Sequence, residues 1–300
     1  MNTTALWPIA LGAFEALGEH YAPDMDQAAT EMGLSGWYGG WLLPAWWAEP
    51  EPISSTRLRL RSPYTSTRYY NERLARAARH GFLTPTAEAE NEYRLTELGR
   101  QAAIHMMEAM YAKMAGLQPL SSTDLERLAR LLHRLVMSCL AVPEPPGKLA
   151  ILTSRRIDPG DDVSVVVRID QYGGDLAAYR DDAHLAAWQP YNIACHAWEA
   201  FSLLWCGEAN SLDGLYKKLE RRGYWLDEYR QALEDLIQRG WVREDVGGYR
   251  VTVLGREIRQ AAEEATDQYF YAPWSCLNLD ETEELRVLLL SLCDGLRLDS

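Results

Sequence analysis

Four residues of types that could support catalysis or metal binding lie in the segment Arg180-Asp181-Asp182-Ala183-His184. A neighbouring aspartate and histidine can hold a metal ion or exchange a proton with a substrate. The sequence offers no third ligand at a spacing typical of a metal site, no Gly-rich phosphate loop and no nucleophile elbow. We therefore expect Asp181 or Asp182 to cap a helix, and we expect no metal, no cofactor and no enzymatic activity. Catalysis by Asp182 and His184 stays as an alternative.

A second group of residues is basic. Seven arginines and a single acidic residue, Glu72, lie between Thr56 and His80. Arginine binds phosphate oxygens and guanine edges with paired hydrogen bonds, and small polar side chains near a helix start contact bases or backbone. The candidate DNA-binding residues are Arg57, Arg59, Arg61, Thr65, Ser66, Arg68, Asn71, Arg73 and Arg76. The alternative is that these arginines form only a solvated face.

A third group is aromatic. Five large rings fall within eleven residues, beside three glycines, and they are Trp37, Tyr38, Trp41, Trp46 and Trp47. Such rings form flat apolar walls with polar N–H and O–H groups, which is how small-molecule pockets are lined. We expect a small aromatic ligand to bind here, between the body of the domain and its long helices. The alternative is an ordinary core packed by tryptophans.

The elements that position these groups are suggested by a repeat. The pattern GFL…YRLTELGR, which begins at Gly81, returns as GWV…YRVTVLGR, which begins at Gly240. The offset is 159 residues at the first glycine and 156 residues between Gly99 and Gly255, so a three-residue loop difference separates the copies. A repeat of this length indicates a duplicated domain rather than a solenoid. Each copy predicts a helix, a glycine, two short strands and a long helix, which is the order of a winged helix-turn-helix.

We therefore predict a mainly α fold with small β-hairpin wings, in which two winged helix-turn-helix units form an intramolecular pseudo-dimer. The predicted domains are a first unit with an aromatic-rich N-terminal segment at 1–142, a linker with a short strand at 143–190, and a second unit at 191–300. Within them we expect one helix over 5–21 and another over 26–32 after Pro23. The valine-rich segment 163–169 has the strongest strand pattern in the chain.

Composition separates the two halves. The net charge is −13, which argues against unspecific nucleic-acid affinity, because phosphate contact needs a basic surface. The acidic excess lies almost wholly in residues 151–300, which carry a net charge of −11. The second predicted recognition helix begins with Asp227 and Glu228, which would repel phosphate. We expect the first unit to be the DNA-binding one.

Other signals place the protein in the cytoplasm. No leader with an apolar stretch and cleavage site and no apolar run long enough to span a membrane is present. The five scattered cysteines indicate reduced thiols rather than a disulfide framework.

The repeat also supports a family resemblance. The order of helix, helix-turn-helix, wing, long helix and terminal helix resembles the MarR family of regulators, and Thr96 to Gly99 and Thr252 to Gly255 resemble that family's T-x-x-G entry to the long helix. The resemblance implies units paired through their first and last helices, with ligands bound between these helices and the DNA-binding heads. The chain also looks like an uncharacterised bacterial winged-helix family, on the segments 180–184, Thr266-Asp267 and Pro273-Trp274.

Together these observations predict a ligand-responsive, DNA-binding transcriptional regulator of MarR type, whose partners are double-stranded DNA and a small aromatic ligand. The alternative is a protein that binds or sequesters a small molecule on a winged-helix scaffold, with little or no DNA binding.

Overall fold

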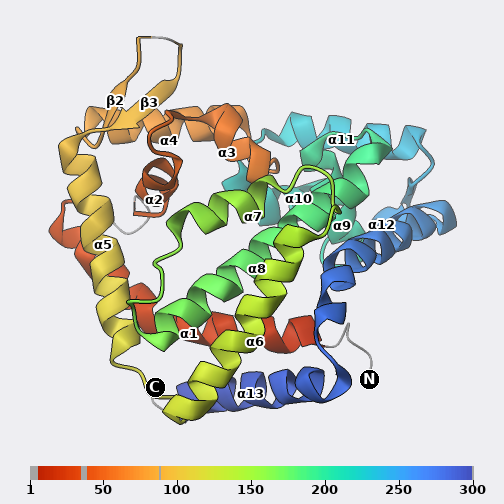
Figure 1. Ribbon diagram of the computed structural model, residues 1–300. Coiled ribbons are helices and arrows are strands. Elements are labelled where there is room, and N and C mark those ends of the chain that lie inside the picture. Colours follow the sequence, from red (N-terminus) through yellow and green to blue (C-terminus); the bar gives the residue numbers. More distant parts are fainter. Residues whose placement is uncertain (1–5, 35–38, 88, 299–300) are drawn as a thin grey trace.

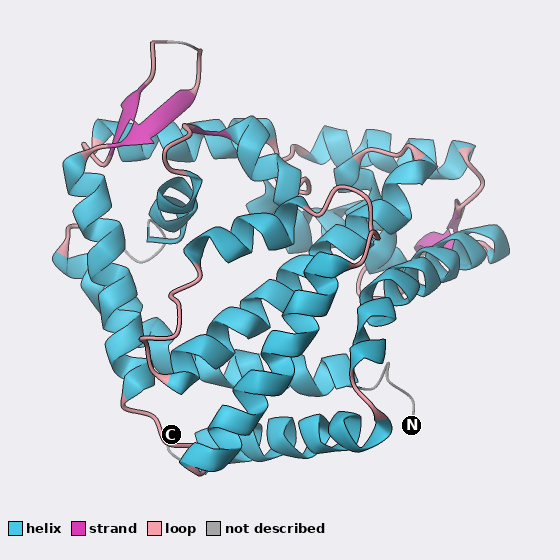
Figure 2. Ribbon diagram, in the orientation of Figure 1, coloured by secondary structure: helices cyan, strands magenta, loops and turns pink. Residues whose placement is uncertain are grey.

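The protein is mainly helical, as a computed structural model shows for residues 6–34, 39–87 and 89–298 (Figure 1). Strands occur in two small antiparallel sheets that lie apart from each other (Figure 2). This confirms the predicted fold class of a mainly α protein with β-hairpin wings. Among the described residues, no helix has both the length and the apolar character needed to cross a membrane.

The first half of the chain contains a winged helix-turn-helix. Its elements are α1 (Leu6–Glu31), α2 (Gly39–Ala48), β1 (Ile53–Ser54), α3 (Ser55–Arg61), α4 (Thr67–Arg79), β2 (Leu83–Pro85), β3 (Glu92–Leu95), α5 (Glu97–Ala115) and α6 (Ser122–Ala141). Strand β3 lies between β1 and β2, with Tyr93 opposite Ile53 and Leu95 opposite Leu83. The predicted helix before Gly81, the two short strands and the long helix after them are therefore confirmed.

The second half follows the same order. Its elements are α8 (Val165–Trp188), α9 (Cys195–Trp205), α10 (Leu212–Leu219), α11 (Leu226–Gln238), β4 (Val242–Asp245), β5 (Gly248–Val251), α12 (Val253–Tyr271) and α13 (Leu279–Leu298). A short helix, α7 (Leu149–Ser154), and a 3₁₀ turn connect the halves. Here a backbone bond from Tyr249 N to Asn210 O, 2.7 Å long, stands where the first unit has its additional strand β1.

The junction between wing and long helix is built identically in both units. Thr96 caps α5 by accepting from Gly99 N at 3.0 Å, and it donates to Gly81 O at 2.6 Å. Thr252 repeats both bonds at the start of α12, with the same distances to Gly255 N and Gly240 O. Glycine is required three residues after each threonine, because a Cβ would lie 2.0 Å from the carbonyl oxygen of Phe82 at Gly99 and 2.1 Å from that of Trp241 at Gly255.

The long helices of the two halves cross over. Helix α1 packs against α5 of its own half and against α13, the last helix of the other half. Helix α8, which holds the place of α1 in the second half, packs against α12 and against α6. In Figure 1, α1, α6, α8 and α13 accordingly form the base of the molecule, with the two helix-turn-helix heads above it.

Two sequence predictions are wrong. The segment 163–169 is not a strand but contains the start of α8, which Ser164 caps by accepting from Val167 N at 3.4 Å. The β-branched side chains of Val166, Val167 and Ile169 are buried against neighbouring helices, and this tertiary packing outweighs their strand propensity. The expected linker over 143–190 therefore includes a full bundle helix.

The helices predicted at 5–21 and 26–32 form one continuous helix, α1, and Pro23 lies inside it. Its ring faces solvent, and the burial of Ala28 and Ala29 one turn later continues the helix along α5.

Candidate nucleic-acid interface and ligand pocket

Helix α4 stands where a winged helix-turn-helix has its recognition helix. Ser66 caps it by accepting from Tyr69 N at 3.1 Å, and Tyr70, Leu74 and Ala77 face the core at spacings of four and three residues. Its remaining side chains include four arginines and one acidic residue, Glu72. The segment thus has the amphipathic pattern and the charge of a helix that approaches phosphate.

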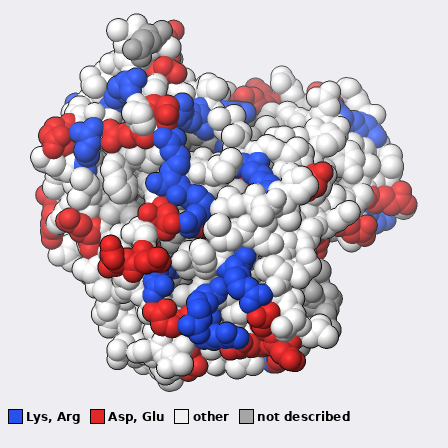
Figure 3. All heavy atoms as spheres, in the orientation of Figure 1, with Lys and Arg blue, Asp and Glu red and all other residues white. Residues whose placement is uncertain are grey.

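Three predicted DNA-binding arginines lie on α3, and two of them are paired with acids. Arg57 forms an ion pair with Glu51 at 3.4 Å, and Arg61 pairs with Asp181 of α8 at 3.3 Å. On the face drawn in Figure 3, basic side chains gather over α3 and α7 and over α6, each group beside acidic side chains. Acidic side chains therefore neutralise part of the positive charge of α3.

The start of α4 contacts the other unit. Thr65 and Ser66 are only 5% exposed. Ser66 N donates to Arg222 O at 2.8 Å, and its hydroxyl donates to Gly223 O at 2.9 Å. Arg59 of α3 bonds the hydroxyl of Tyr224 at 3.2 Å. The N-terminal turn of a recognition helix is the part that reads bases, and here it packs against the turn before α11.

Arg68 is the most heavily engaged arginine of this contact. Its guanidinium lies 3.8 Å from the ring centre of Trp225, donates to Gly223 O, and comes within 3.9 Å of the Glu228 carboxylate. A carboxylate and an aromatic face stabilise a guanidinium in the way a phosphate would. The second unit thus binds Arg68, an arginine that the sequence predicts to contact DNA.

The other predicted residues of this group lie further along α4. Arg73 donates to the hydroxyl of Tyr69 at 2.8 Å and lies 4.4 Å from the centre of its ring. Arg76 is exposed, and Asn71 is half-buried. Arg79, which is exposed in the last turn of α4, was not among the predicted contacts. The arginines of the C-terminal half of α4 remain on the outside of the head.

Helix α11 has the opposite character. It contains one arginine, Arg230, and four acids. Arg230 is paired with Asp227 one turn earlier, and Glu228 accepts a hydrogen bond from Trp225 N at 2.6 Å. Both acids lie in the first turn of α11, where negative charge stabilises a helix.

The structure describes only two side chains of the predicted aromatic cluster, Trp46 and Trp47. Trp37 and Tyr38 lie outside the described residues, and the side chain of Trp41 is not described. Trp46 packs against the main core. Trp47 lines two cavities, of about 280 Å³ and about 420 Å³, and its indole nitrogen has no hydrogen-bond partner among the described residues.

The smaller cavity lies between the first head and the long helices. Helices α1, α2, α5 and α8 supply most of its walls, with contributions from α3, from the end of α7 and from the turn that follows it. Sequence analysis missed most of its lining, including Tyr21, Met107, Met110, Tyr111 and Asp170. The methionines at helical spacing were the available signal, but core methionines give the same pattern.

Asp182 and His184 contact two different elements, α7 and α12. Asp182 is 4% exposed and accepts from Ala150 N at 2.8 Å and Ile151 N at 2.9 Å, so it caps α7 rather than its own helix. His184 lies 3.4 Å from Thr266 of α12, and burial lowers the pKa of its imidazole to about 4. No cluster of three or more His, Cys, Asp or Glu suited to a metal occurs among the described residues. Arg180 pairs with Asp267 at 3.1 Å, so the two segments that resemble the uncharacterised family meet in one helix contact.

Comparison with known families identifies the class of the second unit. A sequence model described as "Helix-turn-helix family" matches residues 178–297, which run from within α8 to α13. The chain therefore contains a helix-turn-helix domain, the class of domain through which DNA-binding regulators contact DNA. Comparisons with curated proteins and with solved structures found no match.

Proposed function

We propose that the protein is a ligand-responsive DNA-binding regulator of MarR type, in which a duplicated unit forms both halves of the dimer. The observation that carries this proposal is the crossed packing of the long helices. Helix α1 packs on α13 and α8 packs on α6, so the first helix of each half meets the last helix of the other. The matching threonine caps and constrained glycines at 96, 99, 252 and 255 support a common origin.

The first head is the one suited to DNA. Helix α4 is basic and α11 is acidic, so phosphate attracts the first and repels the second. Two heads reading one face of B-DNA need recognition helices about 34 Å apart, whereas here Ser66 touches Gly223 at 2.9 Å. A one-headed mode agrees with both observations.

The contact between the heads supplies the switch. Glu228 and Trp225 hold Arg68 as DNA would, and Ser66 and Thr65 are covered. DNA binding through the start of α4 then requires the heads to separate. The cavity of about 280 Å³ includes Trp47 of α2 and Arg61 of α3, both in the first head, and also residues of α8. A ligand that binds better to the protein with its heads in contact, or better to the protein with its heads separated, shifts the equilibrium between these two conformations.

The head contact also favours a second candidate, a protein that sequesters a small molecule and keeps its recognition helices together permanently. The two candidates differ in one property, which is affinity for duplex DNA.

The deciding experiment is a fluorescence-anisotropy titration of the full chain with random duplex DNA at increasing salt. We expect binding at low salt that weakens steeply with salt, because phosphate contact releases counterions. Replacing both Arg73 and Arg76 by alanine is expected to weaken binding at least tenfold. The same change should reduce the salt slope by about two, because each arginine that binds a phosphate contributes about one to that slope.

The matched control is Arg230→Ala in α11, which is expected to leave both quantities unchanged. Absence of binding at low salt contradicts the regulator and leaves the sequestering protein. An equal reduction of affinity in the α4 and α11 variants contradicts the one-headed mode.

A further inference from the structure

Among the described residues that line the cavity between α1, α2, α5 and α8, one carries a carboxylate. Asp170 of α8 lines it, and its Oδ1 accepts a hydrogen bond from the hydroxyl of Tyr21 at 3.3 Å. Burial raises the pKa of Asp170 to about 6, with the Tyr21 hydrogen bond opposing that shift. The carboxylate is therefore largely ionised at neutral pH.

No cation of the described chain neutralises this carboxylate. Arg61, which also lines the cavity, is paired with Asp181 at 3.3 Å. Arg155 pairs with Asp175 at 2.8 Å. The neighbouring Gln171 donates its amide to Ser154 O at 3.1 Å and to Asp175 at 2.9 Å. Asp170 thus faces the cavity with a phenol as its hydrogen-bond partner.

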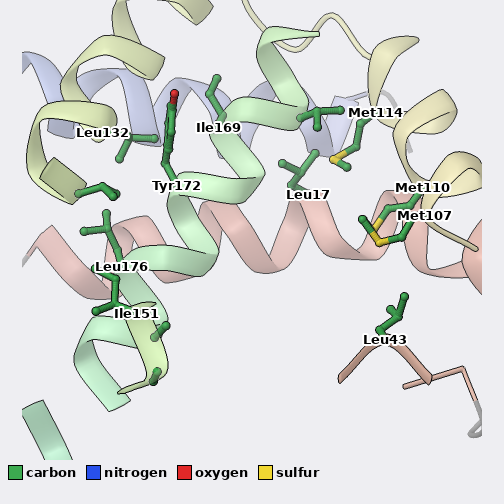
Figure 4. Close-up of a cluster of buried hydrophobic side chains, with 14 of the residues drawn as sticks. Leu17, Leu43, Met107, Met110, Met114, Leu132, Ile151, Ile169, Tyr172 and Leu176 are labelled. Atoms are coloured by element: carbon green, nitrogen blue, oxygen red, sulfur yellow. The ribbon is translucent and has the colours of Figure 1, made fainter. Parts of the chain in front are cut away.

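Apart from Arg61, Ser154 and Gln171, the remaining walls are apolar and polarisable. Tyr21, Trp47 and Tyr111 contribute aromatic rings. Met107 and Met110 extend from α5 on the side of the core where Leu43 points from α2, and all three line the cavity (Figure 4). Aromatic faces attract cations through their quadrupole, and thioethers adapt to ligands of varied shape.

This combination selects by charge. An anion is repelled by Asp170. A neutral compound of the same shape fills the apolar walls but leaves the carboxylate without a counter-charge in surroundings of low polarity. A compound with one positive charge and an apolar body pairs with the carboxylate and also fills the apolar part of the cavity. The volume of about 280 Å³ lies near the small end of ligand pockets, which suits a body of about one ring.

We propose that this cavity is the binding site for a small organic cation, a protonated amine with an aromatic or aliphatic body, whose ammonium group pairs with Asp170. The proposal names the ligand class of the regulator and in that respect rests on the proposed function. The ammonium donates to the Asp170 carboxylate and to the oxygen of Tyr21, while the body lies among Tyr111, Met107 and Met110.

The test uses three compounds of one shape: benzylamine, benzyl alcohol and benzoate. Each is titrated into the full chain without DNA, with tryptophan fluorescence and calorimetry as readouts. We expect benzylamine to bind, benzyl alcohol to bind at least tenfold more weakly, and benzoate more weakly still. Equal binding of the three compounds, preference for benzoate, or no response to benzylamine overturns the proposal.

Two variants locate the charge. Asp170→Asn is expected to weaken benzylamine at least tenfold and to leave benzyl alcohol unchanged. Asp162→Asn removes the same charge from an exposed residue and is expected to change neither. Unaltered benzylamine affinity in the folded Asp170→Asn variant overturns the proposal.

The pH dependence gives an independent measurement on the unmodified chain. Benzylamine affinity is expected to fall as pH drops through about 6, because protonation of Asp170 removes the counter-charge. The two tyrosines that line the cavity stay neutral in this range, since burial raises the pKa of Tyr21 and of Tyr111. A flat pH profile contradicts the assignment. Because these measurements contain no DNA, their failure leaves the duplex titration, and the regulator it tests, unaffected.

Discussion

Helices α4 and α11 occupy equivalent places in two units with the same order of elements, and they carry opposite charge. Helix α4 has four arginines and one acid, whereas α11 has one arginine and four acids. Behind them, the threonine caps and glycine contacts at the entry to α5 and α12 agree to within 0.1 Å. The buried glycines leave no room for a side chain, whereas the exposed faces of α4 and α11 differ in charge.

The largest expected effect tests whether the two scaffolds are under the same constraint. Gly99→Ala and Gly255→Ala each place a Cβ about 2 Å from a backbone carbonyl oxygen. We expect each to lower the free energy of unfolding by about 3 kcal/mol, because a backbone carbonyl cannot move away as a flexible side chain can. Urea unfolding followed by circular dichroism measures both.

Gly12→Ala in α1 is the control, since nothing lies within 4 Å of its added Cβ. It is expected to be neutral or to stabilise by about 0.5–1 kcal/mol, as alanine favours a helix. A large destabilisation by one of the two substitutions and none by the other would show that the two junctions are not equally constrained.

A second prediction concerns the helix pairs α1–α5 and α8–α12. Only the second pair contains His184, whose buried imidazole has a pKa of about 4, below its usual value of 6.5. The unfolded chain therefore binds a proton more readily than the folded chain, and stability present above pH 6.5 is lost as the pH falls toward 4.

We expect this histidine to account for about 2 kcal/mol of acid destabilisation in chemical unfolding measured from pH 7 to pH 4. His184→Gln should remove that share of the slope. An unchanged pH profile in the variant would show that His184 is protonated as easily in the folded protein as in the unfolded one.

The smallest expected effect concerns the contact between the heads. A Cβ at Gly223 would lie 2.5 Å from Cβ of Tyr69 and 2.9 Å from Oγ of Ser66, so Gly223→Ala should push the heads apart. We expect duplex affinity to rise roughly fivefold, which corresponds to about 1 kcal/mol released from the contact.

Gly207→Ala is matched to this variant, because Gly207 has the same φ of +73° and nothing within 4 Å of an added Cβ. Both variants bear the strain of a left-handed alanine, but only the first disturbs the head contact. Equal affinity in the two variants would mean that the contact does not compete with DNA.

The sequence predicts the scaffold well and the site only in part. The caps at Ser66, Thr96 and Thr252 and the turn glycines 81 and 240 act locally, so their consequences can be derived from a few neighbouring residues. The segment 163–169 was wrongly predicted because helix packing, which a single sequence does not reveal, decides its conformation.

The site depends on contacts between distant segments. Arg68 meets Trp225 and Glu228 across more than 150 residues, and Asp170 meets Tyr21 across a similar distance. The residue pattern within either segment does not predict these contacts. From the sequence, the segregation of charge between the two halves and the place of Trp47 in a pocket could be predicted.

The central claim is that one head binds DNA and the other restrains it. Hydrogen–deuterium exchange of the full chain, with and without duplex DNA, tests this directly. We expect exchange to slow in residues 67–95, which include α4 and the first wing, and to quicken in residues 222–228, where the second head releases Ser66 and Arg68. Slowed exchange in α11 and the second wing to the same extent as in α4 would contradict the claim.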